Sequence, residues 1–164
     1  MGKPILCLDF DGVVHSYTSG WKGAEFVADP PVPGALEFIV KALPHFEVHI
    51  FSSRSGQRGG RAAMKNWLLN QYLGLSRAKA SAPEWWVRHV DQEGILNDGV
   101  WPEAASRSAY RLVHAELRWP SEKPPAFVTI DDRAITFDGT WPSIDWLLNF
   151  KPWNKRPSQG QGAA

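Results

Sequence analysis

The chain has 164 residues and a formal net charge of +1, with 43% hydrophobic and 21% charged residues. This is enough chain for one domain with a hydrophobic core, in a composition typical of soluble globular proteins. The balance of charge gives no general sign of a nucleic-acid or membrane partner, and no apolar run is as long as a membrane helix. A single cysteine, Cys7, excludes an internal disulfide partner. Because the first residues lack the pattern of a signal peptide, we expect a cytoplasmic protein.

The first predicted element is a buried strand over residues 5–8, where four apolar residues follow one another. The strand runs into Asp9, and Asp11 and Gly12 follow. In an extended chain, side chains at i and i+2 share one face, and Gly12 permits a sharp turn. Two carboxylates so near to each other are unfavourable unless a cation lies between them or one of them takes a proton. The stretch predicts a metal site, acid–base chemistry or both; taken alone, it is also compatible with an ordinary polar turn.

The next elements predict a parallel crossover unit. Residues 15–33 have no clear period and are expected to form a loop beside the first strand. Apolar residues at helical spacing predict a helix over residues 34–43, and residues 46–51 predict a second strand that leads into Ser52 and Arg54. Parallel strands end at the same edge of a sheet, so both residues should lie near the paired acids.

The middle of the chain is less regular. Residues 57–73 predict a helix with one apolar face. Residues 74–119 are expected to form a small insertion, with short helices near 84–89 and 104–115 and a short strand near 116–119. The glycine-rich residues that open this region lack the terminal lysine and hydroxyl residue of a P-loop.

A third strand is predicted at residues 126–130. It leads into Asp131 and Asp132, and Lys123 precedes it. A final helix over residues 145–150 is expected to pack its apolar side chains onto the domain.

The pattern as a whole predicts one α/β domain over residues 1–150, followed by a flexible tail at 151–164 that is rich in Pro, Gly and Gln. We expect a Rossmann-like three-layer sandwich with a mainly parallel central sheet, in which the first strand is central. The insertion is too short for a large cap domain, so the site should be open.

The three predicted strands bring polar side chains to one edge of the sheet. Clustered carboxylates suit a hard divalent cation such as Mg²⁺, while a serine and a lysine beside them can bind phosphate oxygens. This combination predicts a phosphoryl-transfer site. The residues concerned are Asp9, Asp11, Ser52, Lys123, Asp131 and Asp132.

In this order, the motifs resemble those of the haloacid dehalogenase (HAD) superfamily of aspartate-nucleophile phosphohydrolases, of the small-capped or capless type. The matches are Leu8-Asp9-Phe10-Asp11-Gly12, the strand end Ile50-Phe51-Ser52, Lys123, and Thr129-Ile130-Asp131-Asp132. They cover most of residues 4–140. The resemblance implies a Mg²⁺-dependent phosphatase that acts through an aspartyl-phosphate.

The resemblance also implies individual roles. Asp9 would attack phosphorus, and Asp11 would act as general acid and base. The metal would be bound by the carboxylate of Asp9, by the backbone carbonyl of Asp11, and by Asp132 together with Asp131. Ser52 and Lys123 would hold the phosphoryl group.

Simpler roles remain open for several of these polar residues. Ser52 is also suited to capping a turn, and Lys123 to solvation at the surface. Arg54 and Arg58 are suited equally to binding phosphate and to pairing with acids of the protein. His15 lies near the motif and is expected to be a polar loop residue rather than a contact to substrate.

An open site suits bulky phosphorylated partners, such as a nucleic-acid end or a protein, or small phosphate esters bound with low selectivity. We expect the substrate to be a phosphorylated small molecule or a nucleotide. The pattern Ser52-x-Arg54 also resembles the phosphatase portion of polynucleotide kinase–phosphatases, which implies a 3′-phosphorylated nucleic-acid end as an alternative substrate. A non-catalytic binding or regulatory protein on a HAD fold is the alternative from a different functional class.

Overall fold

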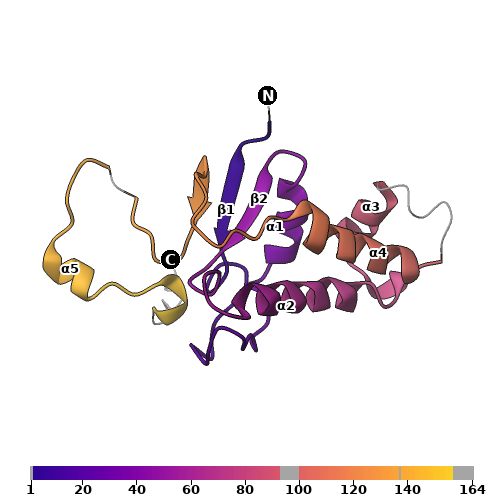
Figure 1. The fold of residues 1–164 in the computed structure, drawn as a ribbon, viewed down its shortest axis with the longest axis horizontal. Helices are drawn as coiled ribbons and strands as arrows, with labels where there is room; N and C mark the ends of the chain where they lie inside the picture. Colours follow the sequence, from indigo (N-terminus) through magenta and orange to yellow (C-terminus); the bar gives the residue numbers. More distant parts are fainter. Residues whose placement is uncertain (1, 93–99, 137, 157–164) are drawn as a thin grey trace, which may run out of the picture.

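The computed structural model describes residues 2–92, 100–136 and 138–156. In this part of the chain, three parallel strands form one open sheet in the order β2–β1–β3 (Figure 1). The strands are β1 (Ile5–Asp9), β2 (Glu47–Phe51) and β3 (Val128–Ile130). The prediction of an α/β fold with the first strand in the centre is confirmed.

The strand register determines which residues meet at the functional edge. Asp9 pairs with Phe51 of β2, and Leu8 pairs with Ile130 of β3. The next residues along the two outer strands, Ser52 and Asp131, therefore leave the sheet beside Asp9. Burial reinforces this arrangement, because the middle of β1 is apolar and almost completely covered.

The helices pack against one another beside the sheet, and most lie where the periodicity predicts them. The crossover helix α1 contacts α3, while α4 contacts both α2 and α3 (Figure 1). The bounds are α1 (Ala35–Ala42), α2 (Gly60–Leu75), α3 (Glu84–Gln92) and α4 (Glu103–Arg111), with a 3₁₀ turn (Lys79–Ser81) before α3 and a π-helical turn (Leu112–Glu116) after α4.

The expected strand over residues 116–119 is wrong. Arg118 forms only an isolated parallel bridge with His49 of β2. Its N–H donates to the carbonyl of Val48 at 3.0 Å, and its carbonyl accepts from the N–H of Ile50 at 2.9 Å. One residue therefore extends the sheet at the β2 edge, and the chain then turns away towards Lys123.

The insertion contributes to the core. Trp86 of α3 is fully buried, with its ring 5.1 Å from that of Tyr72 in α2 and its Nε1 donating to Ser76 Oγ at 3.2 Å. Trp101 and Trp119, from the same insertion, are also buried. Among the described residues, this segment thus thickens the hydrophobic core, where the large apolar rings are removed from water.

The C-terminal segment differs from the prediction. Helix α5 (Ile144–Leu148) forms but lies apart from the sheet (Figure 1), and two of the side chains expected to pack, Trp146 and Leu147, are 49% and 40% exposed. The expectation that this helix packs its apolar side chains onto the domain is therefore wrong. No described helix is long and apolar enough to span a membrane.

The first residues of the expected flexible tail contact the N-terminal motif. Trp153 Nε1 donates to the carbonyl of Gly12 at 2.7 Å, and Asn154 Nδ2 donates to that of Ser16 at 3.2 Å. The segment from residue 151 to 156 thus returns to the loop after β1. The rest of the tail lies outside the described residues.

Candidate active site

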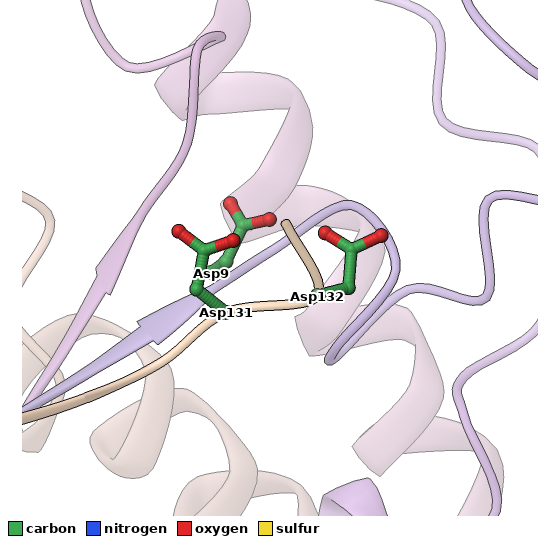
Figure 2. Close-up of side chains that lie close together, drawn as sticks. All are labelled: Asp9, Asp131 and Asp132. Carbon is green, nitrogen blue, oxygen red and sulfur yellow. The ribbon is translucent and has the colours of Figure 1, made fainter. Parts of the chain in front are cut away.

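Three carboxylates meet at the carboxyl ends of β1 and β3. Asp9 is the last residue of β1, and Asp131 and Asp132 follow β3 directly (Figure 2). One carboxylate oxygen of each lies within 4.8 Å of the others. Hard cations such as Mg²⁺ prefer a small number of carboxylate oxygens gathered in this way.

Asp132 provides the test of whether a cation fits. Its side chain is 0% exposed, and neither carboxylate oxygen has a hydrogen-bond partner in the described part of the chain. The guanidinium of Arg133 comes no closer than 3.9 Å. A buried carboxylate without a partner is strongly unfavourable unless a cation or proton compensates its charge. The residues therefore fit a divalent cation.

Gly12 makes the approach of this carboxylate sterically feasible. Its φ of +96° lies in the region that side chains rarely adopt, and a β-carbon here would overlap the carboxylate of Asp132. Glycine after the paired acids is thus required twice, for the turn and for the space that Asp132 occupies.

The acid cluster raises the pKa of its members. Burial, followed by the negative charge of Asp131, raises the pKa of Asp9 from 3.8 to about 7. Burial also raises the pKa of Asp132, although Arg133 partly opposes the effect. A bound cation reverses both effects, because it favours the ionised carboxylates.

A cavity of about 140 Å³ opens beside the acids, large enough for several water-sized groups. Its polar lining includes Asp9, Asp131, Ser52, Ser53 and Lys123. Ser52 is buried, whereas Lys123 is exposed at the rim. Four of the residues predicted from sequence therefore surround one small polar cavity.

Asp11 is close by, but its side chain contacts a different set of groups. Its Oδ2 accepts from Arg54 Nε at 2.7 Å and from Ser52 Oγ at 3.3 Å, and its Oδ1 contacts His15 Nδ1 at 3.0 Å. Burial disfavours ionisation, but the hydrogen bonds from His15 and Arg54 outweigh it, and the pKa of Asp11 is below its usual value. Before a substrate arrives, these contacts therefore favour the ionised form of the Asp11 carboxyl group.

Arg54 is buried and makes its contacts with other groups of the protein. It is 0% exposed, and Cζ of its guanidinium group lies 4.7 Å from the centre of the Trp21 ring. One terminal nitrogen donates to the carbonyls of Gly23, Ala24 and Phe26 at 2.8, 3.0 and 2.9 Å. Arg54 does not line the cavity, so its contacts do not support the expected phosphate binding; they support the alternative pairing with an acid of the protein, Asp11.

His15 is a site residue that the sequence analysis underestimated. It is buried, and its Nε2 accepts from the N–H of Asp29 at 3.1 Å. The other ring nitrogen, Nδ1, then carries the proton and donates to Asp11. The spacing of four residues between Asp11 and His15, across a tight turn, was the signal that could have identified this pair.

The comparisons with known proteins found no match. This holds for family models, for curated proteins and for solved structures alike. The functional interpretation therefore depends on the chemistry of the site, in which Asp9, Asp131, Asp132, Ser52 and Lys123 come together and Asp11 lies next to them.

Proposed function

We propose that this protein is a Mg²⁺-dependent phosphomonoesterase with the Rossmann-like fold of the HAD superfamily. It would act through an aspartyl-phosphate on a phosphorylated metabolite or nucleotide. The observation that carries the proposal is the buried carboxylate of Asp132, which accepts no hydrogen bond in the described part of the chain and belongs to the acid cluster with Asp9 and Asp131, two residues that line the cavity. An ordinary surface cluster of acids would be solvated and would not need a cation.

The cation would be held by Asp9, Asp131 and Asp132, with the Asp11 backbone carbonyl as a further ligand. When bound, it supplies positive charge that offsets the charge developing on the phosphoryl oxygens. The Ser52 hydroxyl and the Lys123 ammonium group, which line the cavity, would hold the same oxygens by charge-assisted hydrogen bonds.

Asp9 would supply the nucleophile. A carboxylate oxygen of Asp9 forms a bond to phosphorus, the bond from phosphorus to the ester oxygen breaks, and the alcohol leaves with a proton. Water then attacks the phosphorus of the aspartyl-phosphate, which restores the carboxylate and releases inorganic phosphate.

Asp11 would move the protons in both steps. Its ionised state, maintained by Arg54 and His15, suits removal of a proton from water in the second step. In the first step Asp11 must give a proton to the leaving oxygen. The negative charge of an arriving phosphate would raise the pKa of Asp11, so that Asp11 takes up the proton it must give.

A polynucleotide 3′-phosphatase is the second candidate. It is favoured by the insertion, in which Trp86, Trp101 and Trp119 are buried and no tryptophan of the described residues lines the cavity. A bulky nucleic-acid end would need such access. The resemblance of Ser52-x-Arg54 to that class rests on two residues, of which Arg54 is buried.

The test is hydrolysis of p-nitrophenyl phosphate with Mg²⁺ and with a chelator. We expect activity that requires the metal and is lost in Asp9→Asn. Asp91→Asn is the matched control, because it removes an exposed carboxylate on α3, away from the site. Absence of activity on any phosphomonoester would leave the non-catalytic alternative, and full activity of Asp9→Asn would exclude Asp9 as the nucleophile.

A further inference from the structure

A second, larger hollow of about 590 Å³ lies beside the candidate active site. The same two stretches of chain line both spaces. In one stretch, Ser52 and Ser53 line the small cavity and Ser55 lines the larger hollow. In the other stretch, Lys123 lines the small cavity and Ser121 lines the larger hollow. Residues two positions apart on two separate segments therefore line the two spaces, which places the spaces close to each other.

Every charged side chain that lines the larger hollow is basic: Arg58, Arg61 and Lys65. None of the three forms an ion pair with a residue that the structure describes. Arg61 has a long hydrogen bond of 3.5 Å to the carbonyl of Trp119, and Lys65 lies 6.0 Å from the ring of that residue. Three neighbouring cations that form no ion pair among the described residues create a positive potential that attracts anions.

The start of α2 adds to this potential. The helix begins at Gly60 with no acidic residue in its first turn and no side-chain cap. The N–H of Gly60 donates to the carbonyl of Gln57 at 3.1 Å, while the dipole of the helix favours a negative charge at this end. The carboxylate of Glu25 lies against Gly59, which lines the hollow and precedes α2, and it offsets part of this positive potential.

We propose that this hollow binds a second phosphate group of the substrate. The preferred substrate would then be a phosphomonoester with a further phosphate close to the one removed, such as a nucleoside bisphosphate or the phosphorylated end of an oligonucleotide. This inference rests on the proposed function, because it takes the small cavity as the place of the reacting phosphoryl group.

The connection between the spaces is rigid. The N–H of Ser52 donates to Ser55 Oγ at 3.0 Å, and the N–H of Ser55 donates to the carbonyl of Ser52 at 2.8 Å. Both serines are buried. A substrate with two suitably spaced phosphates would meet a preformed pair of sites, and preorganisation of this kind lowers the entropy cost of binding.

The kinetic test compares a nucleoside 3′-monophosphate, a nucleoside 3′,5′-bisphosphate and a 3′-phosphorylated trinucleotide. For the wild type we expect kcat/KM to be about tenfold higher with either substrate that has a second phosphate, the combined effect of two exposed ion pairs. In Arg58→Gln/Arg61→Gln, kcat/KM should fall several times more for these substrates than for the monophosphate. Arg88→Gln is the matched control, because it removes an exposed arginine that pairs with Glu84 on α3.

The two substrates distinguish the source of the second phosphate. A bisphosphate as good as the trinucleotide indicates a small-molecule substrate, whereas a clear advantage of the trinucleotide indicates a nucleic-acid end. Equal rates on all three substrates, or an equal loss on all three in the double variant, would overturn the second site.

A binding measurement separates this inference from the proposed function. Fluorescence anisotropy with a labelled 3′-phosphorylated trinucleotide reports on the hollow even if no substrate is hydrolysed. We expect weaker binding in the double variant and a smaller dependence on salt, by about 0.7 in the log–log slope for each phosphate contact removed. Unchanged binding in the double variant, with an unchanged melting temperature as the folding control, would refute the proposal. If the double variant binds the trinucleotide more weakly but the wild type hydrolyses no substrate, the phosphatase function alone is refuted.

Discussion

The unfavourable charge of Asp9 leads to a prediction about stability. Asn at this position keeps the volume of the side chain and removes its charge. We expect Asp9→Asn to be more stable than the wild type at pH 7.5 without metal, although it should be inactive. A gain of stability together with a loss of activity is expected when a residue serves function at a cost in stability.

The sign and size of this effect follow from the pKa. Asp9 has a pKa of about 7 in the folded protein and an ordinary value of 3.8. The folded state therefore holds its proton more tightly than the unfolded state, and stability falls as the pH rises between these two values. Each pH unit corresponds to about 1.4 kcal/mol, which gives an upper limit of about 4 kcal/mol. Because Asp9 is only partly buried, solvent screening lowers our expectation to about 2 kcal/mol.

The assay is thermal denaturation of the wild type and of Asp9→Asn at pH 4 and pH 7.5, in a chelator and in Mg²⁺. In the chelator, the wild type should lose about 4–8 °C relative to the variant between the two pH values, since 1 kcal/mol shifts the midpoint of a domain this size by about 2–4 °C. Mg²⁺ should restore the wild type at pH 7.5 and leave the variant almost unchanged. The reasoning is wrong if the two proteins show the same dependence on pH in the chelator.

Three further substitutions test the other parts of the site. Asp11→Asn should lower turnover about 10²–10⁴-fold, more on an alkyl phosphate than on nitrophenyl phosphate, and leave Mg²⁺ binding by calorimetry largely intact; full turnover on the alkyl phosphate would exclude the acid–base role. Gly12→Ala should lower the free energy of unfolding in urea by more than about 1–2 kcal/mol, from its positive φ together with the overlap with Asp132, and an unchanged value would contradict this geometry. Arg54→Gln should destabilise the protein by about 3–5 kcal/mol, because it leaves the buried Asp11 carboxylate without its charged partner; a near-neutral effect would mean that the ion pair is not formed.

Local patterns in the sequence were sufficient for the three strands of the sheet and for most residues of the candidate site. An apolar run of a few residues predicts a buried strand, and the handedness of a parallel crossover sends successive strand ends to one edge. Those two rules bring Asp9, Ser52 and Asp131 together without any knowledge of side-chain packing. The helices α1 and α2 follow in the same way from periodicity, with errors of a few residues at their ends.

Only the tertiary structure decided the partners of the side chains. The Asp11 carboxylate pairs with Arg54, 43 residues away, and not with the acids that its spacing from Asp9 suggested. The choice depends on burial: Arg54 has no access to solvent, so its charge requires an acid within reach, and Asp11 is that acid. The burial of the Asp132 carboxylate without a hydrogen bond from the described residues is likewise a property of its packing against Gly12. Helix α5 shows the opposite limit, because an amphipathic pattern predicts a helix correctly but does not determine the surface against which it packs.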